Sequence, residues 1–90
     1  MLLAMDTRSG EVKRFLIAPD GAEVCGTQMT ADGRTLFVNI QHPGEDGSFD
    51  AASSNWPATS RDATVAGAAG ARPRSATIVI TRNDGSEIGI

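Results

Sequence analysis

Five dipeptides that end in glycine divide this chain into short segments, and they constrain its fold more than any other feature of the sequence. They are Ser9-Gly10, Asp20-Gly21, Asp32-Gly33, Asp46-Gly47 and Asp84-Gly85. Glycine readily adopts the positive φ angles that tight chain reversals require. The first four pairs follow one another at intervals of 11 to 14 residues, which is typical of antiparallel strands joined by short turns. The turn spacing therefore predicts a β-meander.

The segments between these turns alternate with a period of two residues, as strands do. Residues 12–18, 35–41 and 76–82 show this alternation, and the last two segments are rich in β-branched side chains, which favour strands. In the second segment Val38 falls on one face and Phe37 on the other. Apolar residues on both faces indicate strands that are covered on both sides.

The best-defined element is a hairpin over residues 24–41. The turn Ala31-Asp32-Gly33-Arg34 separates its two strands. No helix is expected anywhere, because the alanines of residues 63–71 are interrupted by glycines and form no apolar stripe.

Residues 42–74 lack a sustained period and are dense in Ala, Gly, Ser, Asp and Pro. Loops of this length inside a compact domain are uncommon. The dipeptide Trp56-Pro57 is the one expected anchor, because a large aromatic side chain beside a rigid residue fixes a loop to a neighbouring surface.

The unit from Met29 to Val38, with its Asp-Gly turn, is typical of the four-stranded blades of β-propellers. Residues 3–16 correspond to the outer strands of a preceding blade. The predicted fold is all-β, an antiparallel meander equal to one to one-and-a-half propeller blades, with a long irregular loop. Residues 1–90 then form one partial propeller, with blade strands within 2–41, the irregular loop at 42–74 and the final strand region at 75–90.

Composition excludes several classes of function. The chain has 90 residues and a net charge of −3, and no basic stripe exists that would neutralise a nucleic-acid backbone. The single cysteine, Cys25, excludes an internal disulfide. No run approaches the roughly 18 apolar residues of a membrane span. Residues 1–11 do not resemble a signal peptide, so the chain expressed alone is expected in the cytoplasm.

Two runs are the most specific in the sequence, Asn39-Ile40-Gln41-His42-Pro43-Gly44-Glu45 and Pro73-Arg74-Ser75-Ala76-Thr77. With the blade turn and Ser54-Asn55-Trp56-Pro57, in this order, they resemble the C-terminal region of PhoX-type alkaline phosphatases over nearly the whole chain. Members of that family are several times longer, so this chain corresponds to a fragment.

The resemblance implies a periplasmic parent that hydrolyses phosphomonoesters with iron and calcium at the centre of its propeller. Those ions would act as Lewis acids on the transferred phosphoryl group. We expect neither ion to bind tightly to this chain alone, and we expect the chain alone to be inactive.

Two charged residues are candidates for the site of the longer protein. Glu23 opens an inner-strand region, where a carboxylate could bind a hard cation, although it is also placed as a surface carboxylate after a turn. Arg74, with Arg72 across a proline, could bind a phosphoryl group, but a solvated loop exit is the commoner outcome for such a pair.

His42 and Gln41, at the end of a predicted strand, are further candidates. His42 is the only histidine and would need partners as a metal ligand or acid–base group, and Glu45 is near in sequence. The alternative is that His42 shapes the strand exit with its imidazole hydrogen-bonded to backbone. Cys25 is expected to be a small buried residue rather than a reactive thiol.

Two functions remain in view. The first is a fragment of a metal-dependent phosphatase whose partners are the missing propeller blades. The second is a non-enzymatic β-sheet remnant or interaction module that self-associates through open sheet edges, since unpaired edges are templates for another strand.

Overall fold

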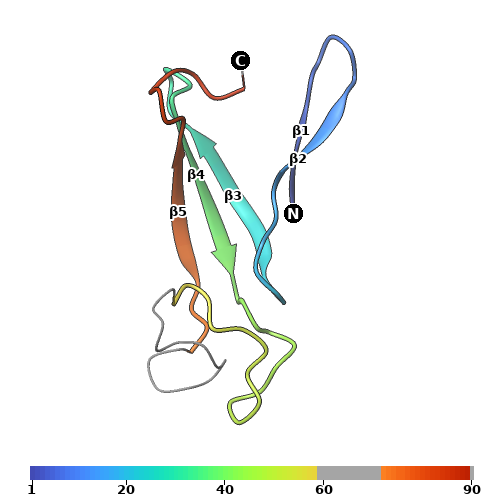
Figure 1. The fold of residues 1–90 in the computed structure, drawn as a ribbon, viewed down its shortest axis with the longest axis vertical. Coiled ribbons are helices and arrows are strands. Elements are labelled where there is room, and N and C mark those ends of the chain that lie inside the picture. Colours follow the sequence, from blue (N-terminus) through green and yellow to red (C-terminus); the bar gives the residue numbers. More distant parts are fainter. Residues whose placement is uncertain (59–71, 90) are drawn as a thin grey trace.

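The computed structural model describes residues 1–58 and 72–89, and within that part of the chain all regular structure is β (Figure 1). The five strands are β1 (Leu2–Met5), β2 (Val12–Leu16), β3 (Glu23–Met29), β4 (Thr35–Gln41) and β5 (Ala76–Thr81). The all-β prediction is confirmed. The described residues include no helix long and apolar enough to cross a bilayer.

The strands form two antiparallel sheets. β1 and β2 pair as a hairpin, and β3, β4 and β5 form a three-stranded sheet in that order. The predicted hairpin over residues 24–41 is confirmed by the pairing of β3 with β4. The alanine-rich residues 63–71, where no helix was expected, lie outside the described residues.

The turn between β3 and β4 is held by the side chain of Asp32. One carboxylate oxygen accepts a hydrogen bond from the Thr30 hydroxyl at 2.6 Å and another from the backbone N–H of Arg34 at 3.1 Å. The Thr30 hydroxyl, followed by the Arg34 N–H, holds the pKa of Asp32 below its usual value. Gly33 has φ 69°, a conformation that favours glycine.

β3 contains an irregularity that the period-two pattern does not predict. Cys25 pairs with Asn39, but the next paired residue of β3 is Gln28, opposite Phe37. Between them Gly26 has φ 61°, and a Cβ at this position would overlap the Asn39 Nδ2. A β-bulge at glycine explains both observations.

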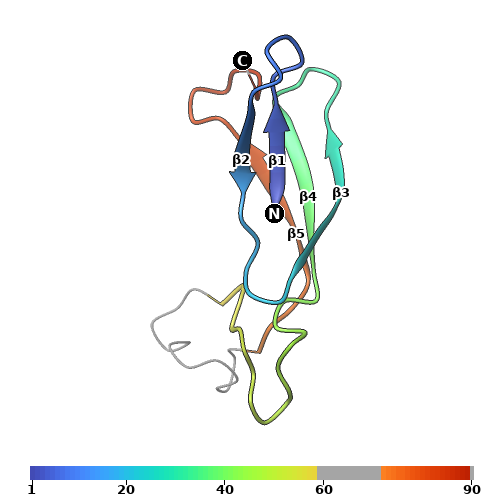
Figure 2. The same ribbon diagram turned by 90° about the vertical axis from the view of Figure 1, so that its right-hand side faces the viewer.

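The core lies on one face of the three-stranded sheet. Leu36, Val38 and Ile40 alternate along β4 and are its buried residues, with Val38 fully buried. The β1–β2 hairpin lies across this face (Figure 2), and its side chains Leu2 and Leu16 pack against the core. The alternation predicted for residues 35–41 therefore selects the core residues correctly.

The opposite face of the same sheet is exposed. We call it the open face and define it by Phe37 and its neighbour Val79, which are 36% and 60% exposed. Covering on both sides was expected from the sequence, but the described residues cover only the face with Val38.

Two further segments complete the core. Trp56 packs against it, and the carbonyl of Trp56 accepts a hydrogen bond from the N–H of Arg74 at 3.0 Å, so the expected anchor is confirmed. After β5 the chain returns to the β3–β4 turn, where the N–H of Ile88 donates to the carbonyl of Gly33 at 2.8 Å.

Candidate functional site

Three of the residues selected from the sequence gather at one end of the three-stranded sheet. Glu23 begins β3 and pairs with Gln41, the last residue of β4, and His42 follows directly. In Figure 1 this end is at the bottom of the sheet, where the chain leaves β4. Antiparallel pairing brings the start of one strand beside the end of the next, so the register itself makes this cluster.

The imidazole of His42 lies among oxygen atoms. Its Nδ1 is 3.1 Å from the carbonyl oxygen of Gly21 and 3.2 Å from a carboxylate oxygen of Glu45, and its Nε2 is 3.4 Å from a carboxylate oxygen of Glu23. All three partners are hydrogen-bond acceptors, so the doubly protonated ring, which donates from both nitrogens, suits the site best.

These contacts explain the direction in which the pKa of His42 is shifted. Burial of the half-buried ring is the largest single influence and disfavours the imidazolium, but the carbonyls of Gly21 and of His42 itself and the carboxylates of Glu23 and Glu45 together outweigh it. The net result is that the pKa of His42 is raised above its ordinary value of 6.5.

The backbone around His42 is fixed from three sides. His42 has φ 39°, and its N–H donates to the hydroxyl of Ser75 at 3.0 Å, just before β5. The N–H of Gly44 donates to the carbonyl of Asp20 at 2.7 Å. The site thus joins the β2–β3 connection, the end of β4 and the start of β5.

Arg74 precedes Ser75, so the backbone places it near this end of the sheet. Its side chain is exposed, and its N–H bonds to Trp56 in the loop. Arg72 instead lies over the ring of Phe49 at 3.8 Å and donates to the carbonyl of Phe49. The two arginines therefore do not form the convergent pair that phosphate binding by this chain alone would use.

The donor set does not fit iron or calcium. Glu23 and Glu45 contact different nitrogens of the same imidazole, which point away from each other, so their carboxylates do not converge on one ion. Calcium binds six to eight oxygen ligands, and residues 1–58 and 72–89 contain no group of three or more His, Cys, Asp or Glu side chains arranged to hold a metal. We call His42 with its two carboxylate partners, Glu23 and Glu45, the His42 clasp, because its side chains form ion pairs with one another rather than a set of metal ligands.

The sequence did not lead us to expect that a row of polar side chains would form next to the clasp. The hydroxyl of Thr77 donates to Asn39 Oδ1 at 2.6 Å, and the thiol of Cys25 donates to Gln41 Oε1 at 3.4 Å. Asn39 and Gln41 share a face of β4, and this alternation could have indicated the row. Cys25 is half-buried, so its predicted small buried role is met only in part.

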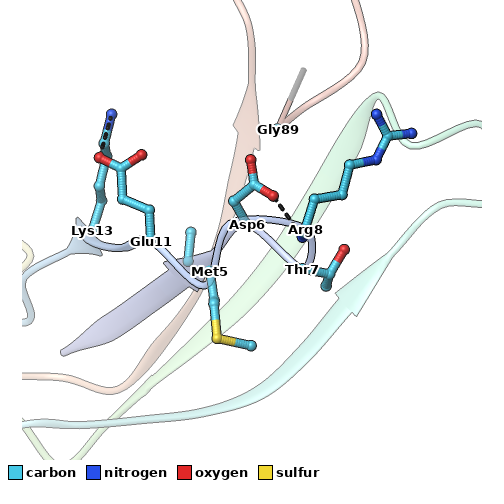
Figure 3. Close-up of a pocket in the computed structure, with 8 residues that line it drawn as sticks. Met5, Asp6, Thr7, Arg8, Glu11, Lys13 and Gly89 are labelled. Carbon is cyan, nitrogen blue, oxygen red and sulfur yellow. Dashed lines mark hydrogen bonds and ion pairs between the residues drawn. The ribbon is translucent and has the colours of Figure 1, made fainter.

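A hollow lies between the tip of the β1–β2 hairpin and Gly89 (Figure 3). Three of its four charged side chains have partners near by: the carboxylate of Asp6 accepts a hydrogen bond from the backbone N–H of Arg8 at 2.7 Å, and Lys13 lies 3.6 Å from Glu11. All four side chains are exposed, so the hollow is a solvated surface and not a built site.

The comparisons with known proteins agree with this fold. A family model described as alkaline phosphatase PhoX matches residues 1–44. Among solved structures the chain is similar to the PhoX of Pseudomonas fluorescens, determined in complex with vanadate, a transition-state analogue, with a TM-score of 0.73 and 39% sequence identity. No curated protein matches the chain.

The match to the Pseudomonas fluorescens protein covers 97% of this chain and 13% of that chain. This chain therefore spans only a small part of the length of its relative. The likeness confirms the predicted fold class, in which these strands are those of one to one-and-a-half propeller blades.

Proposed function

Since this chain corresponds to the C-terminal region of a PhoX-type alkaline phosphatase, we propose that it is the part of a phosphomonoesterase that builds propeller blades, without catalytic activity of its own. The observation that carries the proposal is the fold match, which takes in 97% of this chain but 13% of the relative. In the longer protein the substrate would be a phosphomonoester, and iron and calcium would supply Lewis acids.

The vanadate complex of the relative supports the reaction class. Transition-state analogues bind far more tightly than substrates to the enzymes whose transition state they resemble. We extend this chemistry to the longer protein of which this chain would be a part, and not to the 90 residues themselves.

In this proposal the His42 clasp has a positioning role. It fixes the end of β4 against the β2–β3 connection through Glu23 and Gly21, and against β5 through Ser75. Any ion or phosphoryl group of the longer protein would then be bound by residues from its other blades, together with whichever of Glu23, Gln41 and Arg74 those blades approach.

A chimera tests the proposal. The 13% of the Pseudomonas fluorescens enzyme that matches this chain is replaced by this chain, and hydrolysis of a chromogenic phosphomonoester is measured. We expect the chimera to keep activity, because the folds superpose at a TM-score of 0.73. A matched chimera with Val38→Asp, which places a charge in the buried core, should lose it. A folded but inactive unmutated chimera would contradict the proposal.

A second candidate function rests on the sheet edges. In the three-stranded sheet β4 is central, so β3 and β5 each have one edge that is unpaired within the described residues. We propose as the alternative a non-enzymatic interaction module whose edges pair with another strand. Hydrogen exchange tests it: backbone N–H groups along the outer edges of β3 and β5 that become protected as self-association sets in would favour edge pairing, and unchanged exchange there would count against it.

A further inference from the structure

The chain has a second exposed apolar surface besides the open face. Leu3, Met5 and Val12 of the β1–β2 hairpin are 54%, 61% and 52% exposed, and Met5 pairs directly with Val12. Directly paired residues share a face of a sheet. Figure 3 shows Met5 pointing away from the charged side chains of Asp6 and Lys13. We call this surface the outer face of the hairpin.

The chain itself shows how such a sheet face is covered. Leu2 and Leu16, from the inner side of the β1–β2 hairpin, pack on the face of the three-stranded sheet that carries Val38. The outer face of the hairpin and the open face lie on opposite sides of this two-layer stack. They are therefore free to repeat the same hairpin-on-sheet packing with further molecules.

Charge favours contact between these two faces rather than each face with itself. Residues 1–18 carry three basic side chains (Arg8, Lys13 and Arg14) and two acidic ones (Asp6 and Glu11), a net charge of +1, whereas the remaining residues carry five basic and nine acidic side chains, a net charge of −4. Arg14 pairs with Leu3 and so borders the outer face. Glu23 begins the edge strand of the sheet that carries the open face.

We propose that copies of this chain associate head to tail, with the outer face of the hairpin of one copy on the open face of the next. The interface is heterologous, because two different surfaces meet. It is independent of the phosphatase proposal, since it concerns only the isolated chain. This interface also differs from edge pairing, because it is formed by side chains on the faces of the sheets and adds no strand to either sheet.

Two single variants and their mixture test this arrangement. Val79→Lys places a positive charge on the open face opposite the basic hairpin, and Met5→Glu places a negative charge on the outer face opposite the acidic remainder. Both positions are at least 60% exposed, so the fold should persist, which circular dichroism checks. Phe49→Ser is the matched control, because Phe49 is exposed apolar surface that belongs to neither face.

Sedimentation velocity from micromolar to millimolar concentration gives the readout. We expect the wild type and Phe49→Ser to associate, each of the two face variants to be monomeric, and an equimolar mixture of the two to form a one-to-one dimer through the remaining pair of intact faces. That dimer is specific to a heterologous interface.

Other outcomes overturn the proposal. A wild type that is monomeric over the whole range contradicts it, as does association that survives both substitutions. If only Val79→Lys blocks association, the open face binds a second open face instead. Should Val79→Lys fail to fold, Val79→Thr, of similar shape, must still weaken association relative to Phe49→Ser.

Discussion

Phe37 lies directly opposite Val79 on adjacent strands, on the face of the sheet that turns away from the core. Directly opposite apolar side chains stabilise a sheet by packing against each other. Here both side chains are nevertheless exposed to solvent. Among the described residues, one face of the β3–β4–β5 sheet is therefore covered and the other is left exposed.

The small core makes stability depend on very few side chains. Val38→Ala removes two methyl groups from a fully buried position, and we expect the free energy of unfolding to fall by about 2 kcal/mol or more. Val79→Ala removes the same atoms from a side chain that is 60% exposed and should cost well under half as much. Urea denaturation of the two variants checks this, and equal losses would place the core on the wrong face.

The bulge at Gly26 should tolerate no side chain. Gly26→Ala requires a positive φ at alanine and moves Asn39, whose Oδ1 accepts the Thr77 hydroxyl. We expect a loss of about 1 to 3 kcal/mol. Gly10→Ala is the matched control, because Gly10 also has a positive φ but open space around its Cβ position.

The difference between these two alanine variants isolates the contact with Asn39. It should shrink when Asn39→Ser is combined with Gly26→Ala, since the shorter side chain leaves room. Additive losses in that double-mutant cycle would mean that the glycine is needed only for its φ angle.

The His42 clasp predicts a pH dependence of stability. Because the pKa of His42 is raised in the folded chain, its contribution is fully present below the ordinary value near 6.5 and is lost as the pH rises through the folded-state pKa. The stability difference between wild type and His42→Gln should therefore be largest in mildly acidic solution and shrink toward alkaline pH. Denaturation at a series of pH values measures it.

Titration of the imidazole by NMR tests the cause of that dependence. Glu23→Gln and Glu45→Gln each remove one neighbouring carboxylate, so each should lower the pKa of His42. Glu11→Gln, which removes a carboxylate paired with Lys13 instead, should leave it unchanged. A His42 pKa that ignores both clasp substitutions would contradict the geometry described above.

Local features of the fold followed from the sequence where local chemistry decides them. The Asp32-Gly33 turn and the alternation of Leu36, Val38 and Ile40 predicted the hairpin and the core. The family resemblance, carried chiefly by the residues from Asn39 to Glu45 and from Pro73 to Thr77, was also correct. Trp56 was recognised as an anchor because few other side chains in its loop can bury much surface.

The other features depend on contacts between residues that are far apart in the sequence, which local patterns do not indicate. Nothing in the period of β3 indicates that Gly26 is bulged, because the reason lies across the sheet at Asn39. The partners of His42 were only partly foreseen: Glu45 is near in sequence, but Glu23 and Gly21 reach the imidazole only through the β3–β4 register. Arg72 and Arg74 were considered together, and the structure separates them because Phe49 engages Arg72 alone.

In our proposal these strands are blades of a phosphatase whose chemistry needs other segments. The most direct measurement is turnover of a chromogenic phosphomonoester by the purified chain with calcium and iron added. We predict no hydrolysis above that of the metal ions alone, because the carboxylates of Glu23 and Glu45 contact different nitrogens of His42 and do not converge. Metal-dependent turnover by the 90-residue chain, abolished by Glu23→Gln, would contradict that claim.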